Sequence, residues 1–149
     1  MEKDKIRILV IDGQGGGLGK SIVEQIAQIK QSKKMNELKD FEITAAGTNS
    51  VAASSMLKAG ADIAASGENA VVYNSKKSDI ITGAVGICFA YSMHGEISPN
   101  IANAVCESDA VKILIPISKC NINIMGVTDK PMAQYISEAV EKIREFLKV

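Results

Sequence analysis

The sequence predicts a three-layer α/β fold built on a mostly parallel sheet of five or six strands. The first observation is a run of four large aliphatic residues at positions 8–11, which is typical of a strand buried on both faces. The second is that strand-like and helix-like segments alternate along the whole chain. Such alternation produces a parallel sheet that right-handed crossovers cover with helices on both sides.

The first half of the chain contains the clearest periodic patterns. An apolar stripe predicts a helix that reaches about Gln31, and residues 41–46 form the second expected strand. Ser50 is the expected N-cap of the next helix, which Gly60 ends. Residues 62–65 are a short candidate strand, and Ser66 is expected to cap a helical segment over 69–77. The stripe of the first helix consists of Leu18, Ile22, Ile26 and Ile29.

In the second half, residues 79–83 and 112–117 are expected strands, whereas the apolar run 84–93 fits either a strand or a helix. Ser98-Pro99 is typical of a helix start, because proline suits the first helical position. Residues 123–127 are expected to form a last, edge strand. Thr128 or Asp129 then caps a long final helix, with Ile136, Val140, Ile143 and Leu147 on one face.

The composition argues against several classes of partner. With 149 residues, of which 46% are apolar and 23% charged, the chain is expected to form one domain over 1–149. Seventeen basic residues balance seventeen acidic ones, so no strong field attracts nucleic acid or an anionic membrane. The longest apolar run, 84–91, is too short for a membrane span, and positions 1–5 show no signal-peptide pattern. We therefore expect a cytoplasmic protein with no nucleic-acid or membrane partner.

The most informative segment is the glycine-rich loop that follows the first strand. Five glycines lie within the seven positions 13–19, between a buried strand and a helix. Glycine lets the backbone approach a ligand closely, and a helix N-terminus directs free N–H groups and a positive dipole toward it. The sequence therefore predicts a site for a nucleotide or another phosphorylated metabolite. The candidate residues are Gly13, Gln14, Gly15, Gly16, Gly17, Leu18, Gly19, Lys20 and Ser21, with Thr48, Asn49 and Ser50 after the second strand.

The donors in this site are expected to be the backbone N–H groups of residues 15–19, with Lys20 close by. A Cβ at Gly17 is expected to clash and also to strain the turn. Asp12 ends the first strand, and its carboxylate would repel a phosphate. It is expected to accept N–H bonds from the loop, and the alternative is a role as a metal ligand or in binding a polar substrate.

Two known kinds of phosphate loop compete for this segment. Gly13, Gly17 and Gly19 spell G-x-x-x-G-x-G, which resembles the Rossmann-like loop of short-chain dehydrogenases and implies NAD or NADP. However, residues 45–49 offer neither an acidic residue for a ribose hydroxyl nor an arginine for a 2′-phosphate. Gly19-Lys20-Ser21 resembles the end of a P-loop, but Gln14 stands where its first glycine belongs. The cofactor therefore stays open between NAD(P) and another nucleotide.

Other residues carry weaker signals, and they do not decide whether the protein is an enzyme. Tyr73 and Lys77 match the Y-x-x-x-K pair of short-chain dehydrogenases but follow the third strand, not the fifth. His94 lies in a loop after a strand, where a titrating imidazole suits acid-base chemistry. Lys119 stands beside Cys120, an arrangement that activates a thiolate or marks an ordinary loop cysteine.

The sequence predicts no metal site. Cys88, Cys106 and Cys120 form no C-x-x-C pair, and the chain has a single histidine. Cys88 and Cys106 lie in apolar surroundings and are expected to be small buried residues.

Over nearly its full length the chain resembles a small bacterial family of uncharacterised proteins, a domain of unknown function. The resemblance rests on the segments 12–20, 46–50, 67–71, 95–99 and 113–116. Gln14 belongs to the family pattern, which weakens the P-loop interpretation. The resemblance implies no established activity.

Two apolar segments near loops predict a homodimer. Residues 87–93 and 122–125 supply more apolar surface than one small domain readily covers, and such patches usually mark an interface. The alternative is that both segments are core strands of a monomer.

Overall fold

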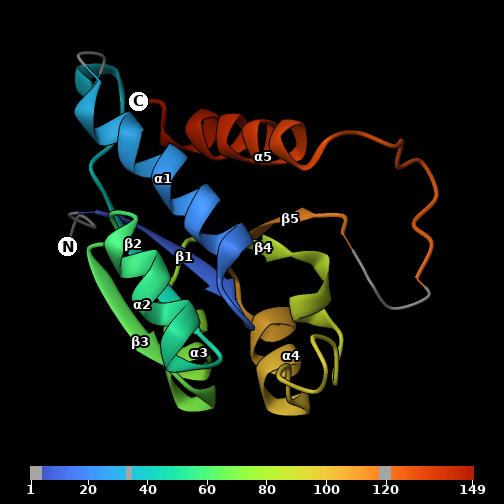
Figure 1. Ribbon diagram of the computed structural model, residues 1–149. Coiled ribbons are helices and arrows are strands. Elements are labelled where there is room, and N and C mark those ends of the chain that lie inside the picture. The colour runs from blue at the N-terminus through green and yellow to red at the C-terminus, as the bar shows by residue number, and fades with distance from the viewer. Residues whose placement is uncertain (1–4, 33–34, 118–121) are drawn as a thin grey trace.

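A computed structural model describes residues 5–32, 35–117 and 122–149. Its centre is a five-stranded sheet in the order β3-β2-β1-β4-β5 (Figure 1), in which every neighbouring pair is parallel. The three-layer α/β fold and the parallel sheet are therefore confirmed. The strands are β1 (Ile6–Asp12), β2 (Phe41–Gly47), β3 (Ile63–Ser66), β4 (Ile80–Ala84) and β5 (Val111–Ile115).

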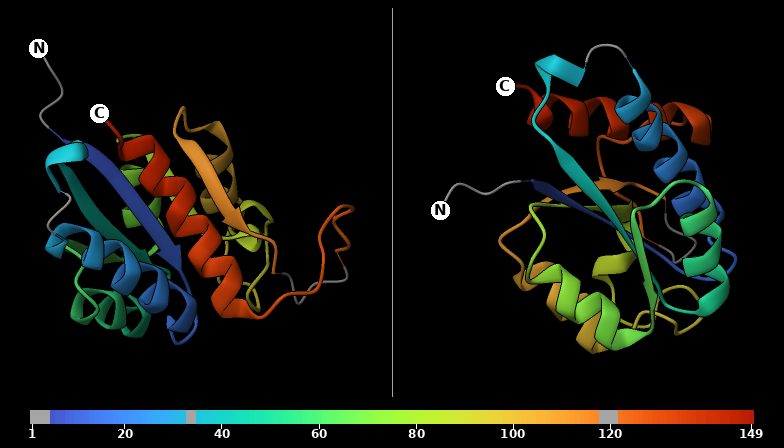
Figure 2. Two further views of the ribbon diagram at one scale, coloured as in Figure 1. Left: turned by 90° about the horizontal axis from the view of Figure 1, so that it is seen from above. Right: turned by 90° about the vertical axis from the view of Figure 1, so that its left-hand side faces the viewer.

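Helices cover both faces of the sheet (Figures 1 and 2). One face carries α1 (Gly17–Gln31), α2 (Ser50–Lys58) and α5 (Met132–Leu147), and the other carries α3 (Glu68–Ser75) and α4 (Pro99–Glu107). Two short 3-10 helices, η1 (Met35–Glu37) and η2 (Val85–Cys88), complete the elements. In the ambiguous run 84–93, Ala84 ends β4, residues 85–88 form η2, and the rest is neither a strand nor an α-helix.

The four aliphatic residues of β1 form the centre of both hydrophobic layers. Ile8 and Val10 pack toward α1 and α5, whereas Leu9 and Ile11 pack toward α3 and α4, and all four are fully buried. Alternation along the strand explains why no polar residue is tolerated in this run. Burying each such side chain contributes about 1.5–3 kcal/mol before the entropy cost of folding is counted.

The strand order places a topological switch point between β1 and β4. The chain leaves β1 through the glycine loop toward β2, and it leaves β4 through η2 toward α4. In open parallel sheets, ligands bind beyond the carboxyl ends of the strands at such a point.

Several predicted helix starts are wrong by one or a few residues. Asn49, not Ser50, caps α2, because its Oδ1 accepts the N–H of Ala52 at 2.9 Å. Gly67, not Ser66, precedes α3, since the backbone there has a φ of 100° that favours glycine. Ser98 does cap α4 as expected, accepting the N–H of Ile101.

The predicted edge strand over 123–127 does not form. These residues are exposed and join no ladder of the described sheet, so no neighbour supplies the hydrogen bonds that a strand needs. The final helix begins at Met132 after Pro131, not after Thr128 or Asp129, because a proline suits the helix start.

Cys106 is exposed, contrary to expectation, and Cys88 is half-buried. Burial, and to a lesser degree the neighbouring Cys106 thiol, raises the pKa of Cys88 to about 11. Cys120 and Lys119 lie outside the described residues.

Within the three described ranges, no helix has the length and apolar character needed to cross a bilayer. The same ranges contain no group of three or more His, Cys, Asp or Glu side chains placed to hold a metal ion.

Candidate functional site

The Asp12 carboxylate binds two backbone N–H groups at the ends of the glycine loop. Its Oδ1 accepts the N–H of Gly13 at 2.8 Å and its Oδ2 accepts the N–H of Gly19 at 2.6 Å, which confirms the expected role of this residue. The side chain is 6% exposed. Burial raises the pKa of Asp12 above its ordinary value of 3.8, the two hydrogen bonds oppose that rise, and the carboxylate of Glu96 adds to it. Asp12 thus links the beginning of the loop to the first turn of α1.

Three of the five glycines are required by contacts inside the protein. A Cβ at Gly16, where φ is 72°, would lie 2.8 Å from the backbone of Ala52. A Cβ at Gly19 would lie 2.8 Å from Cβ of Asp12. A Cβ at Gly13 would lie 2.8 Å from Oγ1 of Thr48. Because real Cβ atoms do not approach other atoms this closely, these glycines permit the fold.

The other two glycines have no such reason to be glycine. An added Cβ at Gly15 or Gly17 would meet no atom within 4 Å, and neither residue has a positive φ. The expected internal strain at Gly17 is therefore wrong, because this residue is simply the first residue of α1. Both lie exposed on the outer side of the loop.

The same stretch presents open backbone donors. The N–H of Gly16 bonds to the carbonyl of Gly13, and that of Lys20 bonds to the carbonyl of Gly16. In the part of the chain that the structure describes, the N–H groups of Gly15, Gly17 and Leu18 have no acceptor. Two of them belong to the first turn of α1, where the helix dipole is positive.

Glu96, which the sequence did not single out, is bound between the first two loops of the sheet. Its Oε2 accepts the N–H of Gln14 at 2.7 Å, and its Oε1 accepts Nδ2 of Asn49 at 2.7 Å and Oγ1 of Thr48 at 3.2 Å. Asn49 Nδ2 also donates to the carbonyl of Gln14 at 2.9 Å. Thr48 and Asn49, expected near a phosphate, therefore hold a carboxylate of the protein itself.

A cavity of about 460 Å³ opens at the switch point, between the glycine loop and the loop that follows β4. Its size lies within the range of small-molecule sites, roughly 300–1,000 Å³. Asp12 and His94 are among the polar groups on its wall, and Leu18, Met93 and Met132 are among the apolar ones. His94 thus reaches the same cavity as the glycine loop.

The walls of this cavity hold an unusual backbone. Gln14, Tyr91, Met93 and His94 have φ values of 49°, 69°, 57° and 56°, in the left-handed region that residues other than glycine rarely adopt. The N–H of Tyr91 bonds to the carbonyl of Ile97 at 2.6 Å, which helps to hold this loop in place. Such strain tends to occur at functional sites.

Of the predicted site residues, Gly13, Gln14 and Leu18 line this cavity, whereas Lys20, Ser21 and Ser50 do not. Lys20 is exposed and lies 4.0 Å from Glu24 on the same helix. Ser21 lines a hollow between α1 and α5, and Ser50 shares a hollow with Gly15 beside α2.

A family model described as Domain of unknown function (DUF3842) matches residues 7–148. The chain belongs to this family. No curated protein and no solved structure matches it. The resemblance inferred from the sequence motifs is thus confirmed.

Tyr73 and Lys77 of this DUF3842 chain do not reach the cavity. Tyr73 lies in the last turn of α3 and Lys77 follows the end of that helix, and Nζ of Lys77 is 4.4 Å from the ring centroid of Tyr73. A hydrogen bond with Lys77 lowers the pKa of Tyr73, but the ring is exposed on the outer surface. The contact between Tyr73 and Lys77 is therefore explained by their spacing of four positions alone.

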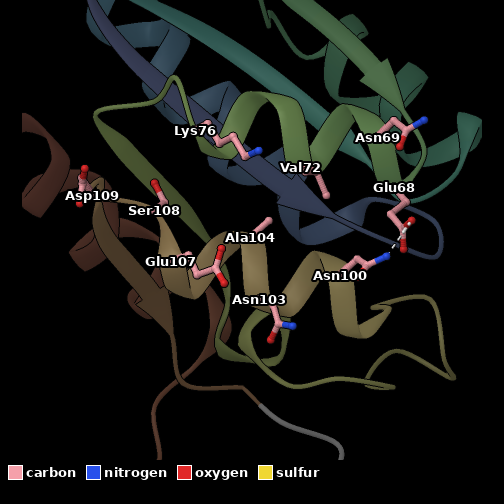
Figure 3. Close-up of a pocket in the computed structure, with 10 residues that line it drawn as sticks. All are labelled: Glu68, Asn69, Val72, Lys76, Asn100, Asn103, Ala104, Glu107, Ser108 and Asp109. Carbon is pink, nitrogen blue, oxygen red and sulfur yellow. Dashed lines mark hydrogen bonds between the residues drawn. The ribbon is translucent and has the colours of Figure 1, made fainter.

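A second hollow, of about 610 Å³, lies between α3 and α4 on the far face of the sheet from α1 (Figure 3). Glu68 at its edge accepts the hydroxyl of Ser98 and, at 3.4 Å, Nδ2 of Asn100. These bonds link the two helix starts and explain the local arrangement. The glycine loop does not contribute to this hollow.

Proposed function

We propose that this protein binds a phosphorylated small molecule, either a nucleotide or another phosphorylated metabolite. The phosphate lies on the N–H groups of Gly15, Gly17 and Leu18, and the rest of the ligand enters the cavity beside them. The observation that carries the proposal is that Gly15 and Gly17 are glycines although a Cβ at either position would contact no protein atom. A ligand that approaches the backbone closely would explain why these two residues are glycines.

The chemistry of the surroundings favours an organic phosphate. Open N–H groups at a helix N-terminus and the positive helix dipole together stabilise an anion. The apolar wall, which includes Leu18 and Met93, suits a base or another uncharged part of the ligand. An NAD(P)-dependent oxidoreductase that uses Tyr73 and Lys77 receives no support, because neither residue lines the cavity.

The proposal predicts that Gly17→Ala and Gly15→Ala weaken binding at least tenfold without loss of stability. A methyl group at either position faces solvent, where it blocks the approach of a phosphate but touches no protein atom. Alanine in place of glycine at the start of α1 raises the free energy of unfolding by up to about 0.5–1 kcal/mol. Calorimetric titration with inorganic phosphate, AMP, ATP, NAD, NADP and sugar phosphates measures binding, and thermal melts measure stability.

Gln28→Ala is the matched control, since Gln28 is exposed on the same helix and distant from the loop. It is expected to bind like the wild type. If the wild type binds none of these compounds, the proposal is wrong. If the two glycine variants bind as well as the wild type, the phosphate does not lie at the loop.

We also propose that the protein is a homodimer. Ile87 is buried and belongs to the core, but Ile122, Ile124 and Met125 are exposed, the last at 84%. Residues 122–131 run outside the sheet and helix layers (Figures 1 and 2). Light scattering at micromolar concentration is expected to give about twice the 15.8 kDa of one chain, and Met125→Lys is expected to shift the mass toward the monomer. A wild-type mass of one chain would show that this expectation is wrong.

A further inference from the structure

Two cysteines that lie far apart in the sequence come together where η2 packs against α4. Cys88 is the last residue of η2, and Cys106 lies in the last turn of α4. Cys88 packs against the buried cluster that contains Ala102 and Val105, and Val105 directly precedes Cys106. A hydrogen bond joins the two thiols, and both cysteines are free. The fold therefore places two thiols from different elements side by side.

The two thiols differ in their access to solvent. Cys106 is exposed, whereas Cys88 is half-buried. Burial, and to a lesser degree the neighbouring thiol, raises the pKa of Cys88 to about 11, so Cys88 keeps its proton at neutral pH. The ammonium group of Lys112 opposes this rise and favours the loss of that proton. A reagent from solution therefore reaches Cys106 first, and Cys88 is in place to react with the product.

We infer that Cys88 and Cys106 are a reversible redox site, which closes to a disulfide in the presence of a small disulfide such as oxidised glutathione. First, the Cys106 thiolate attacks one sulfur of the small disulfide, whose S–S bond breaks and releases a thiolate. The Cys88 thiolate then attacks Sγ of Cys106 and displaces the second small thiolate. Two protein thiols are thus oxidised to one disulfide, and the small disulfide is reduced to two thiols. These take up, through water, the two protons that the protein loses.

The disulfide would act on the wall of the switch-point cavity. Cys88 lies between Gly86 and Tyr91 in the sequence, and both of these residues line the cavity. The bridge would close a loop that contains residues 89–97, which in the reduced protein are held by backbone bonds such as that between Tyr91 and Ile97. Because a disulfide restricts the chain that it encloses, oxidation is expected to reduce the opening of this wall.

The test maps the disulfide in the full chain. The protein is incubated with mixtures of reduced and oxidised glutathione, and its remaining thiols are then alkylated. Glutamyl endopeptidase cuts after Glu96 and Glu107, so the three cysteines fall in three separate peptides. The wild type is expected to lose two of its three alkylatable thiols and to give a cross-linked pair of peptides with Cys88 and Cys106. Dithiothreitol is expected to restore both thiols.

Serine variants separate the roles of the two residues. Cys88→Ser is expected to stop at the mixed disulfide between glutathione and Cys106. Cys106→Ser is expected to react at Cys88 about fivefold more slowly, because that thiol is half-buried. Cys120→Ser is the matched control and is expected to form the same disulfide as the wild type. Circular dichroism verifies folding, and the peptide map of the wild type carries the test if Cys88→Ser does not fold.

Hydrogen exchange tests the effect on the cavity wall. The amides of residues 89–97 are expected to exchange about threefold more slowly in the oxidised wild type than in the reduced one. Cys106→Ser, treated with the same oxidant, is expected to keep the reduced rate. Absence of the cross-linked pair at a high ratio of oxidised to reduced glutathione overturns the inference. Pairing of either cysteine with Cys120 or with a second chain also overturns it, and unchanged exchange in the disulfide form overturns the effect on the cavity.

Discussion

Replacing Asp12 by alanine is expected to lower the free energy of unfolding by about 3 kcal/mol, since each buried donor left without an acceptor costs about 1–3 kcal/mol. The substitution removes the acceptor of both the Gly13 and the Gly19 N–H groups, which lie in the buried part of the loop. Urea unfolding followed by circular dichroism measures the loss. Asp109→Ala, at an exposed position, is the control and is expected to change stability by less than about 0.5 kcal/mol. A loss no larger than that of the control would contradict the role assigned to Asp12.

The pH dependence of the same residue has a definite sign. Because burial raises the pKa of Asp12 above 3.8, the folded protein binds more protons than the unfolded chain between 3.8 and the raised value. The wild type is therefore expected to gain stability relative to Asp12→Asn as the pH falls through this window. The free energy of unfolding of both proteins is measured at about pH 7 and about pH 4. In the difference between wild type and Asp12→Asn, the contributions of most other titrating groups cancel.

Gly47→Ala is expected to lower the free energy of unfolding by about 3 kcal/mol, at the upper end of what overpacking costs. A Cβ at this position would lie 2.5 Å from the backbone nitrogen of Ala53 and 2.7 Å from the carbonyl oxygen of Asn49. Both atoms belong to the backbone at the start of α2, so neither a rotamer change nor a small side-chain shift relieves the contact. The strand end or the helix start must move.

Gly15→Ala is the control for this substitution, because its Cβ would meet open space. Thermal melts and urea unfolding of the two variants, side by side, test the comparison. Equal stability of Gly47→Ala and Gly15→Ala would contradict the packing argument. Binding is expected to weaken in both variants, but for different reasons. Gly47→Ala displaces the backbone that holds Thr48 and Asn49, whereas Gly15→Ala blocks the ligand directly.

The sequence predicts the fold well because its decisive patterns are local. The aliphatic run in β1 and the stripe of α1 each follow from the burial of neighbouring residues, and the crossover rule then arranges them into layers. The ends of helices are harder to predict. Ser50, Ser66 and Thr128 are all residue types that cap helices well. Which residue becomes the cap, however, depends on where the preceding strand or loop ends.

The site is predicted only where its contacts are close in sequence. The bonds from Gly13 and Gly19 to Asp12 span at most seven positions, and that role is foreseeable. Glu96 meets Gln14 across 82 positions, which no local pattern reveals. Its signals in the sequence are the H-G-E run at 94–96, which suits acid-base work, and the G-E-I-S-P segment at 95–99, which is part of the family resemblance. Nor does a sequence show which glycines of a loop serve packing and which leave room for a ligand.

The β1–β4 ladder contains three residue pairs, from Ile8–Ile80 to Val10–Thr82, fewer than any other ladder of this sheet. This short ladder is only part of the contact between the two sides of the sheet, and the cavity lies at its carboxyl end. A ligand that contacts the loops after both strands therefore acts as a clamp across it. At a concentration 100 times its dissociation constant, such a ligand adds about 2.7 kcal/mol against opening. Hydrogen exchange of the β4 amides is therefore expected to be slower with the ligand than without it. This measurement needs no knowledge of any reaction of the ligand.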